Sequence, residues 1–341
     1  MAEGELASAV KVRPATAADV QRIVDISLRM WDGEDYIPNV VDEWMNSEEG
    51  AFVVAEVGGV VAGFARLAFH GRDHGWLEGL RVDPDYRRRG IGRAIGRHLI
   101  NLAVDAGVST LRFSTAVDNR ESIAMNEAMG FVRIGGGRWM ECEDPPWSEL
   151  AAKAEAAAET GTGTGAVVEA GGEAAPVGGI AAVRLSGSDV AEDSGFVRDV
   201  LASNVVAAVG GMLPAGFVFY PAEPAFVTKL ARDGYAYTAG TGQSRAVLLA
   251  SIWSESSSEK PGVVISALEG ERGSCLAILS AAFRDFAKDG IGAGVATVPC
   301  ESIAYHLLRE MGFSSWMEEE VPAHLPTVLL YDYPVEAGLR R

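Results

Sequence analysis

A short run of arginines and glycines, Arg87–Ala94, has the residue types and spacing of a site for phosphate groups. Gly90 and Gly92 carry no side chain, so an anion can approach their backbone closely. At the start of a helix, the first backbone N–H groups are free and the helix dipole favours negative charge. Six arginines and two acids lie between Arg81 and Arg97, although the whole chain carries a net charge of −18. This local excess of positive charge predicts an anion site.

The same residues admit three other interpretations. The spacing of Gly90, Gly92 and Gly96 matches a dinucleotide-binding pattern, but that pattern needs an apolar strand running into its first glycine. Here the polar segment Asp83–Arg89 precedes that glycine instead. A P-loop is excluded because no Gly-Lys-Ser/Thr follows. The plainest alternative is a helix start with a solvated arginine face, and the two glycines argue against it.

The elements that position this loop are predicted from hydrophobic periodicity and turn residues. Gly58-Gly59 predicts a hairpin, Thr16 an N-cap, and Asp118 with Glu121 the capping box of a helix. The predicted order is mixed α/β: a strand and helix over 12–31, a helix over 38–46, strands over 52–56, 60–69 and 76–82, a helix from 91 to 107, a strand over 110–116, a helix from 118 to 129, and strands over 131–134 and 138–142.

Composition predicts a folded soluble protein, since 48% of the residues are hydrophobic and 8% aromatic. No apolar run approaches the ~20 residues of a membrane-spanning helix, and the first ten residues lack the segments of a signal peptide. The three cysteines lie far apart. They fit a reducing compartment, so we expect a cytoplasmic protein without a metal. The acidic charge argues against nucleic acid or a membrane as the main partner.

Two halves are joined by a segment of different composition. Residues 146–179 are rich in Ala, Glu and Gly, which predicts a short helix and then a flexible linker. Glu-Ser-Ile-Ala leading to Met-Gly-Phe occurs twice, at 121–131 and 301–313, and indicates an internal repeat. We therefore expect domains over 1–145 and 180–341.

Several motifs of the first half follow the order of one known family. They are Leu77–Pro84, then Arg87-x-x-Gly90-x-Gly92, then Asn119, then Met129-Gly130-Phe131. Over residues 11–141 this sequence resembles the GNAT (GCN5-related) acetyltransferase superfamily, and the repeat extends the resemblance to a tandem-domain architecture. The resemblance implies two mixed α/β domains, with acetyl-CoA as acyl donor in the first. There, the strand ending at Val82 would splay from the strand starting at Thr110.

Asp35–Pro38 followed by Glu43-Trp44 is similar to the histidine N-acetyltransferase-like branch of the superfamily.

The resemblance also implies where acetyl-CoA binds. The pantetheine arm would bond to the backbone of Leu80–Val82, and the pyrophosphate would lie on residues 87–93. Arg87 occupies the position where the family most often has Gln or Arg. The residues implied in cofactor binding are Leu80, Arg81, Val82, Arg87, Arg88, Arg89, Gly90, Ile91, Gly92, Arg93, Ala94, Asn119, Ser122 and Asn126.

Glu78 is the candidate general base for deprotonating an amine acceptor. It lies two residues before Leu80 and four before Val82, so we expect the three side chains on one face of the strand. A carboxylate in a partly apolar cleft beside Trp76 should have a raised pKa. The alternative is a solvated strand glutamate.

A general acid is missing from the pattern. Asn126 stands where many relatives have a tyrosine, and an amide can orient the CoA sulfur but cannot donate a proton as a phenol does. The thiolate would leave unassisted or take a proton from water. On the presumed acceptor side, Trp31 and Tyr36 could form a wall and Asp35 could attract a cationic amine. The alternative is a solvated acidic loop.

The second half lacks a comparable anion site. After the strand over 263–268, Glu269 and Glu271 surround glycines with one arginine, so the field has lost its positive sign. Leu308 stands in the place of Asn126. We expect a degenerate copy of the fold that binds no acyl-CoA, in a monomer with pseudo-dimeric halves or in a homodimer.

The predicted activity is transfer of an acetyl group from acetyl-CoA to a primary amine, most simply that of a small molecule. Two alternatives remain open. One is acetylation of protein N-termini or lysines, which shares the chemistry. The other is a non-catalytic acyl-CoA-binding sensor or scaffold.

Overall fold

A computed structural model describes residues 10–160, 180–253 and 260–335. These residues form two compact units, each drawing on distant parts of the chain. Unit 1 comprises the described residues within 1–115, 119–133 and 331–341, and unit 2 those within 116–118 and 134–330.

Unit 1 is built on a sheet with the strand order β1-β2-β3-β4-β5-β15. Neighbours from β1 to β4 pair antiparallel, and β4 pairs with β5 in parallel. Its elements are β1 (Val10–Pro14), α2 (Val20–Ser27), α3 (Ile37–Asn46), β2 (Gly50–Val57), β3 (Val60–His70), β4 (His74–Val82), α4 (Ile91–Asp105), β5 (Thr110–Ala116), α5 (Arg120–Met129) and the end of β15 (Val328–Tyr333), with short 3-10 turns at Ala17–Asp19, Trp31–Gly33 and Pro84–Tyr86.

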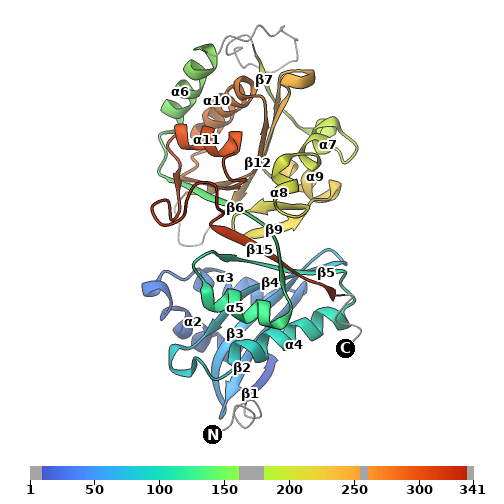
Figure 1. The fold of residues 1–341 in the computed structure, drawn as a ribbon, viewed down its shortest axis with the longest axis vertical. Helices are drawn as coiled ribbons and strands as arrows, with labels where there is room; N and C mark the ends of the chain where they lie inside the picture. The colour runs from blue at the N-terminus through green and yellow to red at the C-terminus, as the bar shows by residue number, and fades with distance from the viewer. Residues whose placement is uncertain (1–9, 161–179, 254–259, 336–341) are drawn as a thin grey trace. The chain divides into compact units, whose positions relative to one another are not determined.

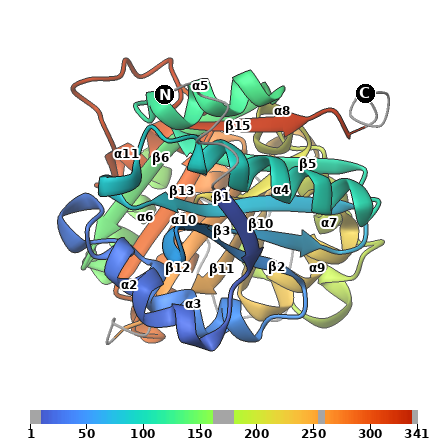
Figure 2. The ribbon, with the colours of Figure 1, turned by 90° about the horizontal axis from the view of Figure 1, so that it is seen from below.

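Helices cover both faces of the unit 1 sheet (Figure 2). Alternate residues of a strand point to opposite faces, and the apolar runs of β2 and β3 supply side chains for both. On one face, Ile23 and Trp44 of α2 and α3 pack with Phe64 of β3. On the other, the start of α4 lies so close that a Cβ on Gly63 would stand 3.2 Å from Ile91 and 3.3 Å from Ile95.

The last described strand of the chain completes unit 1. Tyr331 of β15 stacks on Phe113 of β5 at 5.1 Å, and its hydroxyl donates to Glu127 of α5 at 3.1 Å. Next to it, Arg112 and Asp332 form an ion pair at 2.9 Å. The sheet of the first half therefore depends on residues more than two hundred positions downstream.

Unit 2 repeats this order with other strands: β7-β10-β11-β12-β13-β6. The parallel pair is again the fourth and fifth, β12 with β13. Unit 2 contains the following elements, of which the helices and some of the strands are labelled in Figure 1: β6 (Val132–Glu143), α6 (Trp147–Thr160), β7 (Ala182–Arg184), α7 (Gly195–Leu201), α8 (Asn204–Ala208), β8 (Met212–Ala215), β9 (Val218–Pro221), α9 (Pro224–Asp233), β10 (Tyr235–Ala239), β11 (Ala246–Trp253), β12 (Gly262–Gly270), α10 (Arg272–Lys288), β13 (Ala293–Val298), α11 (Ile303–Glu310) and β14 (Ser314–Ser315), with 3-10 turns at Gly187–Val190 and Gly242–Ser244.

Helix α6 begins in the segment where the sequence predicts a linker. Its Trp147, Ala151 and Ala154 are buried in the core of unit 2 beside Phe283 of α10. Small side chains at helical spacing allow this close packing, so residues 147–160 belong to the folded unit. Residues 161–179 of the predicted linker lie outside the described residues.

Most of the local predictions are confirmed. Gly58 and Gly59 form the β2–β3 turn with φ of 61° and 82°, and Thr16 makes a capping box with Asp19. Two predictions are wrong. Asn119, not Asp118, caps α5. The predicted break between two strands is absent, because β6 is one continuous strand, and the backbone of Ala208 and Val209 lies close to its Gly135. Among the described helices, none is long and apolar enough to cross a membrane.

Candidate active site

The predicted phosphate loop lies between β4 and α4. Gly90 is the N-cap residue of α4 in the left-handed conformation, with φ of 77°. The first hydrogen bond within the helix runs from the N–H of Ala94 to the carbonyl of Gly90 at 2.9 Å. The backbone N–H groups before Ala94 in the first turn therefore have no acceptor within the helix. Arg87, Arg88 and Arg89 are exposed around them. This arrangement fits a phosphate group at the helix start.

Gly92 leaves space beside this loop because it has no side chain. A Cβ at Gly92 would stand 3.1 Å from Sδ of Met125 and 3.8 Å from Val82, so a larger side chain would fill the space between α4, α5 and β4. Gly96 has a different role. Its missing Cβ lets α4 pack against Met129 of α5, where a Cβ would meet Cε at 2.8 Å.

Strands β4 and β5 part beside the loop. They pair only from His74 to Trp76, opposite residues 110–112. The backbone of residues 77–82 has no partner on β5, and this is the splay that the resemblance implies. Leu80, Arg81 and Val82, the residues expected to bond the pantetheine arm, lie in this stretch.

A β-bulge at Gly79 changes the side-chain pattern of β4. The β3–β4 register shifts between Phe64 and Arg66, and Gly79 has φ of 68°. Glu78 contacts Arg66 of β3, whereas Leu80 and Val82 lie near Gly92 on the α4 face. The expectation that Glu78, Leu80 and Val82 share one face is therefore wrong, because the bulge interrupts the alternation.

Glu78 is largely buried on the α3 face. Its Oε1 accepts a hydrogen bond from Nη1 of Arg66 at 2.6 Å, and its side chain is 15% exposed. Burial raises the pKa of the Glu78 carboxyl, and the charge of Arg66 opposes this rise. The direction of this shift agrees with the raised pKa expected for the Glu78 carboxyl.

Arg81 lies on the same face, in an aromatic setting. Its guanidinium donates to both oxygens of Asp35, at 2.8 and 2.9 Å. It also lies over the rings of Trp31 and Tyr36, 4.4 and 5.5 Å from their centroids. The ring of Tyr36 is partly exposed, but desolvation of its hydroxyl raises the pKa of Tyr36 to about 12. The three predicted acceptor residues are thus brought together around Arg81.

The charge of Asp35 is already balanced. Its side chain is fully buried and its carboxylate faces Arg81. This geometry favours a structural role for Asp35 over the predicted attraction of a cationic amine. Trp31 and Tyr36, by contrast, are 59% and 42% exposed, so their rings remain accessible as a wall.

The predicted polar residues of α5 bond within their own helix. Asn119 caps it by accepting from the N–H of Ser122 at 3.2 Å. Asn126 is 6% exposed, and its Nδ2 donates to the carbonyl of Ser122 at 2.9 Å. These bonds fix the helix that packs on Gly92.

One anchor of the site was not predicted. Asp83, 1% exposed at the end of β4, forms ion pairs with Arg22 and with Arg29, the latter at 2.6 Å. The available signal was the spacing of the two arginines, seven residues apart on one helical face. Together they tie the α2 segment to the base of the phosphate loop.

The matching loop of unit 2 is capped by its own acid. Glu271 is the N-cap residue of α10, and its carboxylate accepts from the N–H of Ser274 at 3.1 Å. Glu269 next to it accepts from Asn204 at 2.8 Å. A carboxylate therefore stands at this helix start, where Gly90 leaves the start of α4 open.

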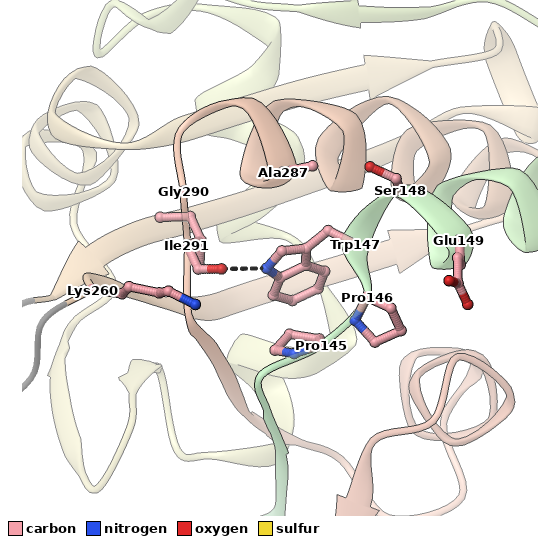
Figure 3. A pocket seen from close by; sticks show the side chains of 9 residues that line it. All are labelled: Pro145, Pro146, Trp147, Ser148, Glu149, Lys260, Ala287, Gly290 and Ile291. Carbon is pink, nitrogen blue, oxygen red and sulfur yellow. Dashed lines mark hydrogen bonds between the residues drawn. The ribbon is translucent and has the colours of Figure 1, made fainter.

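A shallow cavity in unit 2 does not compete as an active site. It has a volume of about 340 Å³ and lies where α6 meets the end of α10 (Figure 3). Nε1 of Trp147 donates to the carbonyl of Ile291 at 2.7 Å, which fixes the ring in the wall. Its charged lining residues are Glu149 and Lys260.

Among the described residues of the chain, no three His, Cys, Asp or Glu side chains lie close enough together to hold a metal ion.

Comparison with known proteins decides the family. The pattern of the Acetyltransferase (GNAT) family matches residues 20–131. The N-alpha-acetyltransferase RimI of Mycobacterium tuberculosis is 32% identical over 130 residues, which cover 37% of this chain and 80% of RimI. The chain belongs to the GNAT acetyltransferase family. It is an acyl-CoA-dependent N-acetyltransferase, and GNAT enzymes take their acyl group from acetyl-CoA.

Other GNAT relatives differ in the acceptors that their names give. An aminoglycoside N(6')-acetyltransferase type 1 from Stenotrophomonas maltophilia is 28% identical over 135 residues, 37% of this chain and 88% of that protein. The ribosomal protein bS18-alanine N-acetyltransferase of Escherichia coli is 42% identical over 59 residues, 17% of this chain and 40% of that protein. The likeness to the histidine N-acetyltransferase-like branch stays a prediction.

The tandem GNAT fold is confirmed by solved structures. A tandem GNAT protein from the clavulanic acid biosynthesis pathway aligns over 96% of this chain and 98% of its own, with a TM-score of 0.53 and 16% identity. The glucosamine N-acetyltransferase region of a fungal multi-domain β-N-acetylglucosaminidase aligns over 95% of this chain and 38% of that one, with a TM-score of 0.60 and 12% identity. At such identities the likeness concerns the GNAT fold alone.

Proposed function

We propose that this enzyme acetylates a primary amine of a small molecule, with Glu78 as the general base. The observation that carries the proposal is the bulge at Gly79. It turns Glu78 and Arg81 to the α3 face, while Leu80 and Val82 face α4 and the phosphate loop. The acceptor would then meet the base from one side of β4, and the acyl donor would lie along its unpaired edge.

The loop residues Arg87–Arg93 and the first turn of α4 would hold the pyrophosphate of acetyl-CoA. Bound acetyl-CoA supplies the acetyl group as a thioester. The arginines of the loop provide charge, and Gly90 and Gly92 leave the backbone accessible. The backbone of Leu80–Val82, which has no β5 partner, is available for the arm of the same molecule.

Glu78 would accept the proton that the amine loses. An amine with a pKa of ~10.4 is almost wholly charged at neutral pH, and an α-amine near ~7.7–8 is partly neutral. As the carbon–nitrogen bond forms and the carbon–sulfur bond breaks, the amine proton passes to the carboxylate and then to solvent. Asn126 has no acidic proton to give, so the thiolate would leave unassisted or take its proton from water.

The acceptor side combines a neutralised ion pair with exposed rings. Since Asp35 is paired with Arg81, the choice of amine acceptor would depend on contact with the rings of Trp31 and Tyr36. These rings suit an amine attached to an apolar or planar group. A second candidate, the α-amine of a protein N-terminus, is supported by the likeness to RimI.

An acceptor screen tests the proposal. The full chain is incubated with acetyl-CoA and a panel of amino acids, aromatic amines, aminoglycosides and short peptides with free N-termini, and free thiol is measured. Turnover with a small-molecule amine supports the leading proposal. Turnover confined to peptides supports the second candidate. Acetyl-CoA binding without turnover across the panel would contradict both and favour an acyl-CoA sensor.

A further inference from the structure

Arg66 and Glu78 are cross-strand partners on the α3 face of unit 1. Nη1 of Arg66 lies 2.6 Å from Oε1 of Glu78, and the two side chains are 12% and 15% exposed. The pair thus joins the proposed base to the strand beside it. Within the described residues, the second carboxylate oxygen of Glu78 has no hydrogen-bond partner, so it remains available to take a proton.

Arg66 is itself held in place from α3. Its Nη2 donates to Oγ of Ser47 at 3.1 Å, and its guanidinium lies 5.3 Å from the ring centroid of Trp44. A guanidinium fixed by a fork of bonds and by an aromatic face has little freedom to turn away. The same Trp44 ring fits against Gly79, where a Cβ would stand 2.5 Å away. One tryptophan therefore supports both the arginine and the bulge.

The charged groups around Glu78 act in opposite directions. Burial disfavours the ionised carboxylate, and Glu43 of α3 adds a like charge that raises its pKa further. Arg66 of β3 acts against both. Tyr36, at the start of α3, is also within electrostatic reach of Glu78. Arg66 is the cation that favours the ionised form of Glu78.

We infer that Arg66 is the positioning residue of the general base: its bond to one oxygen of Glu78 aims the carboxylate and leaves the other oxygen open to the amine. This inference rests on the proposed function, because it assigns Arg66 a role only if Glu78 takes the proton. Nothing in it requires Arg66 to touch the acceptor or acetyl-CoA.

The test is the pH dependence of kcat/KM for Arg66→Met and Arg66→Lys, measured with the best α-amine acceptor. The acidic limb of this profile reports the base in the free enzyme. Loss of a neighbouring cation disfavours the carboxylate, so in Arg66→Met the limb should move to higher pH by ~1 unit or more. Above the new limb, most of the rate should return. Arg66→Lys keeps the charge and should restore much of the wild-type profile.

Two further variants keep the test decisive. Ser47→Ala removes one hydrogen-bond partner of Arg66 and should shift the acidic limb in the same direction by a smaller amount. This variant replaces Arg66→Met in the test if Arg66→Met does not fold. Arg13→Met removes a partly buried arginine that pairs with Asp19 at 2.7 Å and Glu56 at 2.6 Å, away from Glu78. It should leave the limb in place. Acetyl-CoA affinity, measured for each variant, should stay within about twofold of wild type.

The outcomes separate this inference from the proposed function. A limb that stays fixed while kcat/KM falls evenly at every pH would show that Arg66 is only structural, and it would overturn the inference. The proposed base would still stand if Glu78→Gln is inactive. If Glu78→Gln is fully active, the base itself is wrong.

Discussion

The carboxylate of Asp35 accepts two hydrogen bonds from the guanidinium of Arg81, at 2.8 Å from Nε and 2.9 Å from Nη2. Both side chains are buried, with exposures of 0% and 10%. Arg81 follows the bulge of β4 and Asp35 precedes α3. The pair therefore ties the proposed acceptor wall to the strand that carries the base.

Asp35→Asn should destabilise unit 1 strongly. The change leaves the buried guanidinium of Arg81 without a counter-charge, which costs about 3–5 kcal/mol. Chemical denaturation measures the loss. Asp85→Asn is the control, since its carboxylate is 69% exposed and meets Arg29 at 3.0 Å. That variant should lose no more than ~1 kcal/mol of stability. Equal losses in the two variants would show that the buried Asp35–Arg81 pair contributes no more to stability than the exposed pair.

Gly92→Glu should abolish acetyl-CoA binding while the protein stays folded. The new side chain would bring negative charge into the space between Met125, Val82 and the first turn of α4. Ligand at a hundred times its Kd stabilises a protein by ~2.7 kcal/mol, and the variant should lose the resulting shift in Tm. Gly92→Ala should keep most of that shift, since the flexible Met125 can move aside. A normal shift in Gly92→Glu would remove the loop from the binding site.

The full chain should bind one acetyl-CoA. Glu271 already caps α10 in unit 2, whereas the start of α4 in unit 1 is open. Calorimetric titration should give one site in the wild type and none in Gly92→Glu. Two equal sites would show that unit 2 also binds acyl-CoA. Fragments cut near residues 145 and 180 are unsuitable here, because unit 1 needs residues 331–333 and unit 2 includes residues 134–160.

Tyr331→Ala should destabilise unit 1, although Tyr331 lies near the C-terminal end of the chain. The ring is 2% exposed and stacks on Phe113. Removing a buried aromatic side chain costs about 3–5 kcal/mol. Tyr331→Phe keeps the ring and loses only the hydrogen bond to Glu127, for about 1 kcal/mol. If Tyr331→Ala melts like the wild type, β15 is not an integral strand of unit 1.

The sequence predicts the phosphate loop well because its signals are local. Gly90, Gly92 and the arginines lie together, and the turn at Gly58-Gly59 needs only its own residues. The bulge at Gly79 was missed, since a glycine in a strand has several explanations and this one depends on Trp44 from a separate helix.

Contacts between residues far apart in the sequence could not be predicted either, because they depend on which elements pack together. Asp35 looked like a free acid, because its partner Arg81 lies 46 positions away. The place of Tyr331 in unit 1 depends on pairing across the whole second half, which no local pattern encodes. The role of Arg66 is not predictable from the sequence, because it depends on Glu78, its partner across the sheet.

The most direct test of the account is the rate of Glu78→Gln across pH. Glutamine keeps the size of the side chain but cannot take a proton, so acetyl-CoA binding should stay close to wild type. Turnover at neutral pH should fall by ~10²-fold or more, and the deficit should shrink at alkaline pH as the amine loses its own proton. Glu43→Gln, an exposed acid on α3, should retain most of the activity. Wild-type turnover by Glu78→Gln at neutral pH would contradict the account.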